Sequence, residues 1–269
     1  MHKYVLKRFA MLIPVLIGVT FIVFFIMALT PGDPVTIILG DNATAENVAK
    51  LTEELGLNDP LIVRYVRYMG GLLKGDLGKS YSNQLSVLDQ IADRFPNTLI
   101  LAAAAIFVSL LIGIPVGIIS AKKQYTWIDN TSMITALMGV SMPVFWLGLL
   151  LVIVFSLKLR WLPSQGMGQG LIGVLKSLIL PAVSLGAGSA AMVTRMTRSS
   201  MLEVIRQDYI DTARSKGVKE SAITIKHMLK NALIPIITVV GLQFGHLLGG
   251  AVLTETVFSW PGLGRFMVE

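Results

Sequence analysis

Five long stretches without a single Asp, Glu, Lys or Arg run through this chain of 269 residues. Each is at least as long as the roughly 18 residues that a helix needs to cross the hydrocarbon core of a membrane. The stretches are residues 9–32, 95–121, 130–157, 177–194 and 231–254. A hydrophobic fraction of 54% and a mean hydropathy of +0.70 also exceed what soluble chains show. The sequence therefore predicts an all-α integral membrane protein.

The segments between these stretches predict how the chain is divided. Residues 1–94 hold a first transmembrane helix at 9–30 and a small external domain, and residues 95–269 form a membrane core. The first stretch is too long for a cleavable signal peptide and lacks a small-residue cleavage site. The predicted spans of the core are about 97–121, 131–157, 177–196 and 232–254.

The basic residues predict the orientation of the spans. Segments 1–8, 122–129 and 195–230 carry three, two and eight Lys or Arg, whereas 158–176 carries three. Basic residues gather on the cytoplasmic side, so the N-terminus and the loop at 195–230 are predicted to be cytoplasmic. The long segment 33–94 is then external, and it is net acidic. The formal charge of +7 reflects cytoplasmic loops near anionic lipid, and we expect no nucleic-acid binding.

The external domain is predicted to contain short helices. Thr44 is a suitable N-cap for a helix at 45–55, which ends near Gly56. A second helix is predicted at 60–73, with Leu61, Tyr65, Tyr68, Met69 and Leu72 on one face. A third, at 86–94, leads into the second span.

The polar loop at 195–230 is the most unusual part of the sequence. It carries eight basic and four acidic residues in a chain whose charged fraction is only 14%. Apolar residues recur with helical spacing over 201–215, Gly217 breaks the pattern, and a second amphipathic helix is predicted at 219–229. Two short helices bent at a glycine form an elbow with its tip towards the cytosol. Composition leaves two functions open, contact with a soluble partner or adhesion to anionic lipid.

The sequence gives no support to an enzymatic function. The three histidines, His2, His227 and His246, are far apart and lack acidic partners at metal-ligand spacing. No Gly-rich phosphate loop ends in Lys-Ser/Thr, and the glycines at 166–170 follow no strand, as a nucleotide-binding fingerprint would. The uncharged stretches hold no acids for an intramembrane protease, and the chain has no cysteine. We expect no catalysis and no cofactor or metal bound by the chain itself.

His246 is the only ionisable group well inside a predicted span, and Gln243 lies on the same helical face. Ionisable residues inside a membrane are candidate functional sites. The structural alternative is a neutral imidazole bonded to Gln243 or to a helix carbonyl. Prolines and glycines in the spans fit both tight helix packing and helices that rock around a central cavity. Gln243 and His246 are therefore candidate lining of a path through the membrane.

Several motifs resemble one family of transport proteins. Asp211-Thr212-Ala213-x-x-x-Gly217 looks like the Glu-Ala-Ala-x-x-x-Gly signature of ABC-importer permeases, with Asp and Thr preserving charge and small size. The signature's closing Leu-Pro is absent after Leu229, as is usual in the peptide/nickel (oligopeptide/dipeptide) branch. The other motifs that resemble this branch are Thr197-Arg198-Ser199-Ser200, Lys226-His227-x-x-Lys230-Asn231-Ala232-x-x-Pro235, Glu255-x-x-Phe258-x-x-Pro261-Gly262-Leu263-Gly264, Tyr4-x-x-x-Arg8 and Pro31-Gly32-Asp33-Pro34. Together they extend over essentially the whole chain.

The resemblance implies a multi-pass inner-membrane protein with the type I ABC importer fold, whose sixth helix would follow Glu269. It implies a second homologous permease subunit, two ABC ATPase subunits, an extracytoplasmic solute-binding protein and membrane lipid as partners. ATP and Mg would be used by the ATPase subunits. In this family the signature forms a coupling helix that docks on the ATPase. The residues that the resemblance assigns to it are Tyr209, Asp211, Thr212, Ala213, Lys216, Gly217 and Val218, with Ala213 and Gly217 small for close approach.

Peptides are the expected cargo, but permeases for nickel, glutathione and oligosaccharides share the resemblance. The absence of a His/Met/Cys cluster in the spans favours peptides over nickel. Two other classes remain as alternatives. A secondary transporter would need coupling-ion ligands, and the spans contain no acidic residue. A membrane anchoring protein would tolerate scrambling of residues 208–218.

Overall fold

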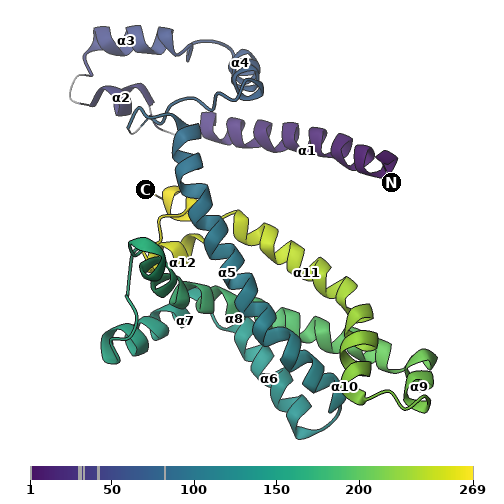
Figure 1. Cartoon of the computed structure of the whole chain (residues 1–269). Coiled ribbons are helices and arrows are strands. Elements are labelled where there is room, and N and C mark those ends of the chain that lie inside the picture. Colours follow the sequence, from purple (N-terminus) through teal and green to yellow (C-terminus); the bar gives the residue numbers. More distant parts are fainter. Residues whose placement is uncertain (1, 30–31, 33, 41–42, 82, 269) are drawn as a thin grey trace. The chain divides into compact units, whose positions relative to one another are not determined.

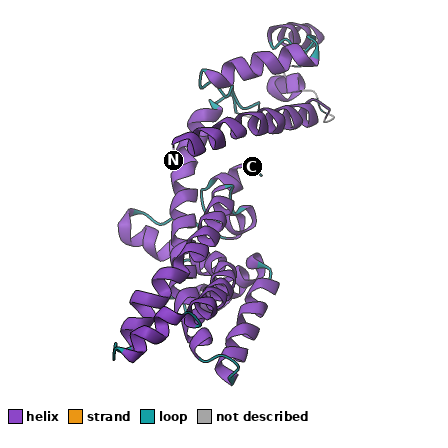
Figure 2. Ribbon diagram, turned by 90° about the vertical axis from the view of Figure 1, so that its right-hand side faces the viewer, coloured by secondary structure: helices purple, strands orange, loops and turns teal. Residues whose placement is uncertain are grey.

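A computed structural model describes residues 2–29, 32, 34–40, 43–81 and 83–268. Helices and loops make up this part of the chain, which contains no β-strand (Figures 1 and 2). The chain divides into two compact units, residues 1–92 and 93–269.

The first unit holds one long apolar helix and three short helices. They are α1 (His2–Leu29), α2 (Pro34–Leu39), α3 (Ala45–Glu54) and α4 (Leu61–Leu73). The side chain of Thr44 accepts a hydrogen bond from the backbone N–H of Asn47 at 3.3 Å, which confirms the predicted cap of α3. Pro31 and Asp33, in the turn predicted after the first span, lie outside the described residues.

The helix predicted at 86–94 is not a separate element. Its residues form the first turns of α5 (Val87–Lys122), which continues as one helix into the second predicted span. Pro96 lies inside α5, but the helix continues through it. The backbone therefore passes from residues 87–94 into the second predicted span without a loop.

The second unit is a helical bundle in which α8 (Gly170–Ile205) contacts most other elements. α6 (Trp127–Ser141), α7 (Val144–Leu151) and α11 (Lys230–Leu248) all pack on it (Figure 1). α8 is lined with small buried residues, including Ser184, Ser189 and Ala190, so neighbouring backbones can approach it closely.

The crossing of α5 and α8 is especially close. A Cβ atom built on Gly113 would lie 2.7 Å from the Cβ of Val193, and one built on Gly117 would lie 2.5 Å from the Cβ of Thr197. The same two positions face the carbonyl oxygens of Ala190 and Thr194, at 3.0 and 2.8 Å. No room remains for a methyl group, so glycine is required at both positions.

Among the described residues, four helices are long and apolar enough to cross a membrane, within α1, α5, α8 and the continuous segment Glu220–Leu248. The span predicted at 131–157 is not a single straight helix. α6 ends at Ser141, and the chain bends by 98° before α7 begins at Val144. α7 then continues directly into a π-helical segment, Val152–Lys158. The physical reason is Pro143, which disfavours helical backbone at the preceding residue, and Met142 is accordingly extended (φ −81°, ψ 127°).

The loop predicted at 195–230 is shorter than its composition indicated. α8 continues to Ile205, and helical structure resumes with α10 (Glu220–Ala222), a π-helical segment Ile223–Leu229 and then α11. The helix predicted at 201–215 is divided, because residues 201–205 complete α8 and α9 (Asp208–Ser215) is separate. The apolar side chains of 201–205 pack against the bundle core and extend α8 beyond the membrane segment.

A buried carboxylate organises the C-terminal hairpin, residues 250–266, which contains α12 (Val252–Val257) and α13 (Leu263–Phe266). Glu255 is fully buried and accepts hydrogen bonds from the Thr98 hydroxyl at 3.1 Å and the Arg265 backbone N–H at 2.9 Å. Trp260, also fully buried, donates its indole N–H to the Asn97 carbonyl at 2.9 Å. The hairpin is thereby fixed to the start of the membrane part of α5.

Candidate functional site

The elbow, residues 208–220, follows α8 after a break in the helix at residues 206–207. Gln207 is extended (φ −85°, ψ 139°) and starts α9 in a new direction. On α9, Ile210 is fully buried and Ala213 is 9% exposed, in a core cluster with Met201 and Met228. Asp208, Asp211, Thr212 and Arg214 face outwards. The amphipathic sequence of α9 therefore attaches one face to the bundle and presents a polar face to solvent.

Gly217 ends α9 through a regular helix-stop motif. It has φ +75°, a left-handed conformation that residues with a Cβ atom rarely adopt. The Val218 N–H donates to the Ala213 carbonyl at 3.2 Å, and the Gly217 N–H donates to the Arg214 carbonyl at 2.9 Å. This pair of bonds is the Schellman arrangement, which satisfies the last carbonyls of a helix. The bend predicted at Gly217 is confirmed.

Arg214 connects the two arms of the elbow. Its guanidinium lies 3.2 Å from a carboxylate oxygen of Asp211 on α9 and 3.2 Å from one of Glu220 on α10. The hydrogen bonds to Glu220, followed by those to Asp211, raise the pKa of Arg214 above its ordinary value, so this group stays charged. On the other side of α9, the Asn231 amide donates to the Tyr209 hydroxyl at 3.1 Å, which links α9 to the first turn of α11.

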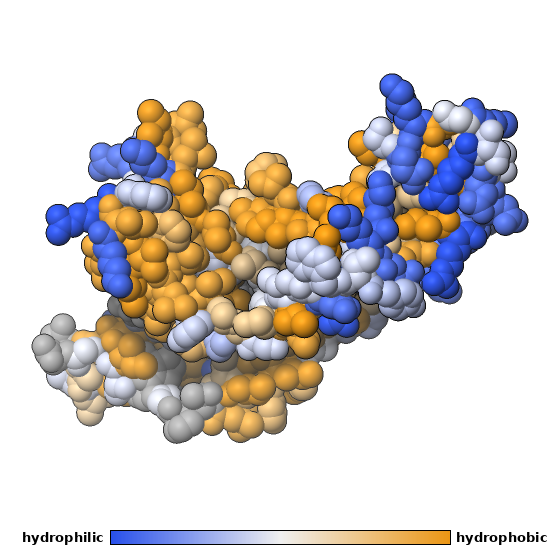
Figure 3. Space-filling model, turned by 90° about the horizontal axis from the view of Figure 1, so that it is seen from below, coloured by the Kyte–Doolittle hydropathy of each residue, from blue (hydrophilic) through white to orange (hydrophobic). Residues whose placement is uncertain are grey.

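The tip of the elbow is open to solvent. All residues from 214 to 220 are exposed. In Figure 3 hydrophilic residues gather at the right, at the α9 end of the bundle, whereas hydrophobic surface covers much of the remainder of that view. The elbow is therefore a polar, hydrogen-bonded projection from a bundle with a largely apolar surface.

The predicted coupling residues divide into three groups. Asp211, Thr212, Lys216, Gly217 and Val218 lie on the exposed side of the elbow, and Tyr209 is partly covered by its bond to Asn231. Ala213 faces the core of its own chain, where its small side chain packs in the cluster with Met201 and Met228. Gly217 has open space around its Cβ position, so its backbone conformation, and not crowding within the chain, requires glycine.

Gln243 and His246 lie on α11. Gln243 is partly exposed and His246 is exposed on the surface of the bundle. Within the described part of the chain, no group of three His, Cys, Asp or Glu side chains is arranged to hold a metal ion.

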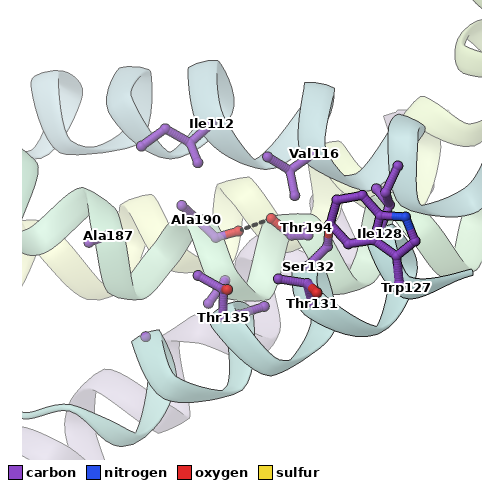
Figure 4. Close-up of a pocket in the computed structure, with 13 residues that line it drawn as sticks. Ile112, Val116, Trp127, Ile128, Thr131, Ser132, Thr135, Ala187, Ala190 and Thr194 are labelled. Atoms are coloured by element: carbon purple, nitrogen blue, oxygen red, sulfur yellow. Dashed lines mark hydrogen bonds between the residues drawn. The ribbon is translucent and has the colours of Figure 1, made fainter.

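A groove of about 570 Å³ runs between α5, α6 and α8 (Figure 4). Thr131, Ser132 and Thr135 line it from α6, and Ile112 and Val116 line it from α5. None of its lining residues is charged, and neither Gln243 nor His246 is among them. The groove therefore offers hydroxyl groups on a mostly apolar wall.

A buried ion pair secures α6 to α8 next to this groove. The Nε and Nη2 groups of Arg198 each donate a hydrogen bond of 2.6 Å to the Asp129 carboxylate. The hydroxyl of Ser120, on α5, also donates to this carboxylate. Asp129 is 2% exposed. The Lys122 ammonium, at the end of α5, donates to the Thr224 hydroxyl of the π-helical segment at 3.3 Å. These contacts join the ends of α5, α6 and α8, and they connect α5 to the π-helical segment that follows the elbow.

Comparison with known families identifies the chain. The family described as "Binding-protein-dependent transport system inner membrane component" matches residues 113–269, and its N-terminal counterpart matches residues 1–102. The chain belongs to this family. It is a permease subunit of the ABC importer type, a multi-pass protein of the inner membrane.

Characterised relatives match the chain over its full length. A dipeptide transport permease, DppB of Alkalihalophilus pseudofirmus, is 44% identical over 292 residues, covering 100% of this chain and 88% of the relative. A glutathione transport permease, GsiC of Salmonella paratyphi A, is 44% identical, covering 100% and 86%. An oligopeptide transport permease, AppB of Bacillus subtilis, is 40% identical, covering 100% and 87%.

The fold also matches a solved transporter. The inward-facing MetNI methionine ABC transporter aligns with a TM-score of 0.52 and 20% identity, over 65% of this chain and 77% of that chain. This permease therefore has the type I ABC importer fold, as the sequence motifs implied.

Sequence reasoning missed the residues that hold the elbow in shape. Glu220 and Asn231 carry no signal in a linear pattern, because their partners are six or more positions away. Asp129 and Arg198 are 69 positions apart. Asp129 could have been singled out, because it directly precedes the uncharged stretch 130–157. A carboxylate buried at that position requires a positively charged partner.

Proposed function

We propose that the elbow is the ATPase-coupling element of a peptide importer, docking into a groove on an ABC ATPase subunit. The observation that supports this most is the exposed stretch 214–220, held in a defined shape by the Gly217 stop and the Arg214 bridges. A rigid polar projection can transmit force from a partner because its arms do not fold independently of the bundle. Asp211, Thr212, Lys216 and Val218 are its contact residues.

The remaining machinery follows from this role. A second homologous permease completes the path, and two ATPase subunits bind and hydrolyse ATP with Mg. An extracytoplasmic solute-binding protein delivers the cargo. The N-terminus and the elbow face the cytoplasm, in agreement with the basic residues of the loops. The permease itself performs no chemistry.

Peptides are the proposed cargo. The relatives DppB, AppB and GsiC carry dipeptide, oligopeptide and glutathione in their names, and glutathione is itself a small peptide. The described residues offer no cluster for a metal ion, which makes nickel the weaker alternative. Uptake of labelled dipeptide, glutathione and nickel by the complete importer in proteoliposomes distinguishes these cargoes. Nickel uptake without peptide uptake would overturn the assignment.

The docking role can be tested with substitutions in the elbow. Gly217→Glu and Lys216→Glu should abolish ATP-dependent uptake and reduce co-purification of the ATPase subunits, while the permease still inserts. Lys158→Glu is a matched charge change on an exposed residue of the predicted external loop, and it should leave co-purification unchanged. Normal uptake by the Gly217→Glu importer in proteoliposomes would contradict the proposal.

A further inference from the structure

α4 carries two different faces, and only one of them is explained by contacts within the first unit. Tyr65 and Tyr68 pack on α1, where the Phe21 ring meets Tyr65 edge-on at 5.3 Å and the Phe24 ring lies 5.7 Å from that of Tyr68. A second face is apolar and exposed. Its residues are Ile62, Val63, Val66 and Leu73, which are 62%, 46%, 63% and 84% exposed.

The spacing of these residues makes a continuous stripe. At 100° per residue, Ile62, Val66 and Leu73 fall within about 40° of one another on the helix circumference. Arg64 and Arg67 project roughly 100° or more from the stripe by the same geometry. Arg64 lies over the Phe24 ring, 6.0 Å from its centre, and Arg67 pairs with Asp59 at 2.6 Å. α4 therefore has an aromatic face that packs on α1 and a separate apolar face that no described part of the first unit covers.

The contacts with α1 fix the level at which α4 lies. The Tyr65 hydroxyl is 3.0 Å from the Thr20 hydroxyl, and it donates to the Ile17 carbonyl at 3.1 Å. With a rise of 1.5 Å per residue, Thr20 and Ile17 are roughly 13 and 18 Å below the end of α1 at Leu29. The hydrocarbon core is about 30 Å thick, so these contacts lie near the middle of the apolar part of α1. A helix attached there cannot stand clear of the bilayer.

We propose that α4 is embedded in the membrane beside α1, with its Ile62, Val66 and Leu73 stripe among the acyl chains. The apolar side chains of α1 are likewise exposed around the helix and, in a membrane-spanning helix, contact lipid. Arg64, over the Phe24 ring, and Arg67, paired with Asp59, lie on the other faces, so neither charge enters the stripe. The occupant of the stripe is therefore lipid and not the binding protein or water.

The absence of cysteine from the sequence makes a direct test practical. Single variants Val66→Cys and Ile62→Cys carry a nitroxide label in the complete importer in lipid nanodiscs. Collision accessibility to oxygen, which concentrates in acyl chains, is compared with accessibility to a water-soluble nickel chelate. Ile22→Cys, on the side of α1 away from α4, provides the lipid reference, and Lys50→Cys on α3 provides the water reference.

Both stripe labels should show an oxygen-to-nickel accessibility ratio close to that of Ile22 and several-fold above that of Lys50. Arg67→Cys, on another face of α4, should show a lower ratio than Val66→Cys. High nickel accessibility at both stripe positions would place the stripe in water and overturn the proposal. Low accessibility to both reagents would show that a protein partner covers it, which would also overturn the proposal. The two stripe variants are read together so that a local disturbance by one label does not decide the result.

Discussion

At the scale of single residues, Gly217 shows why a short motif needs glycine. Its φ of +75° is the reason, since open space surrounds its Cβ position. Gly217→Ala should therefore lower the unfolding free energy by about 1 kcal/mol through backbone strain, without a steric clash. Gly217→Asn should lose less, because asparagine tolerates this conformation better. Thermal unfolding of the two purified variants checks the order, and equal stability of Gly217→Ala and the parent protein would contradict it.

Glu255 stabilises the C-terminal hairpin by accepting hydrogen bonds from buried donors. Replacing it with alanine leaves the Thr98 hydroxyl and the Arg265 N–H without an acceptor. Each buried donor left unpaired costs about 1–3 kcal/mol. Glu255→Gln keeps the volume and one acceptor oxygen, so it should lose less stability than Glu255→Ala in thermal unfolding. Thr256→Ala, an exposed change on the same helix, is the control and should have little effect.

At the scale of elements, the Asp129–Arg198 pair determines how firmly α6 is held to α8. Asp129→Ala should cost about 3 kcal/mol, because it leaves a charged guanidinium in a largely buried site. A double-mutant cycle with Asp129→Asn and Arg198→Gln, read by chemical unfolding, isolates the pair.

The Arg214–Glu220 pair of the elbow is a solvent-exposed control, because its side chains are 41% and 48% exposed. It should contribute less than about 1 kcal/mol. A coupling energy for Asp129 and Arg198 no greater than that of the exposed pair would show that the buried bridge does not hold α6 in place.

Elements also show what the sequence could predict. Uncharged length predicted the membrane helices, Thr44 predicted the start of α3, and Gly217 predicted the bend of the elbow. The bend after Met142 was foreseeable from Pro143, but hydropathy alone joined α6 and α7 into one span. The break at Gln207 could not be predicted in this way, because no glycine or proline lies near it. It follows from the burial of Ile210 and Ala213, which depends on contacts distant in sequence.

At the scale of the whole molecule, the proposed coupling role requires that the elbow faces the cytoplasm. With no cysteine in the sequence, Lys216→Cys and Gln165→Cys are clean probes, and both parent residues are exposed. An impermeant maleimide should label Gln165→Cys in intact cells and Lys216→Cys only in inverted vesicles. Labelling of Lys216→Cys in intact cells would reverse the proposed topology and move the elbow away from the ATPases.

The close crossing of α5 and α8 also limits how this permease can change conformation. Where Gly113 and Gly117 meet Val193 and Thr197, the two backbones are separated by less than a side chain. Sliding one helix along the other by a turn would bring larger residues to these positions and cause a steric clash. We therefore expect α5 and α8 to move as one rigid body during a transport cycle. The rearrangement would then occur at the bend between α6 and α7 and along α11.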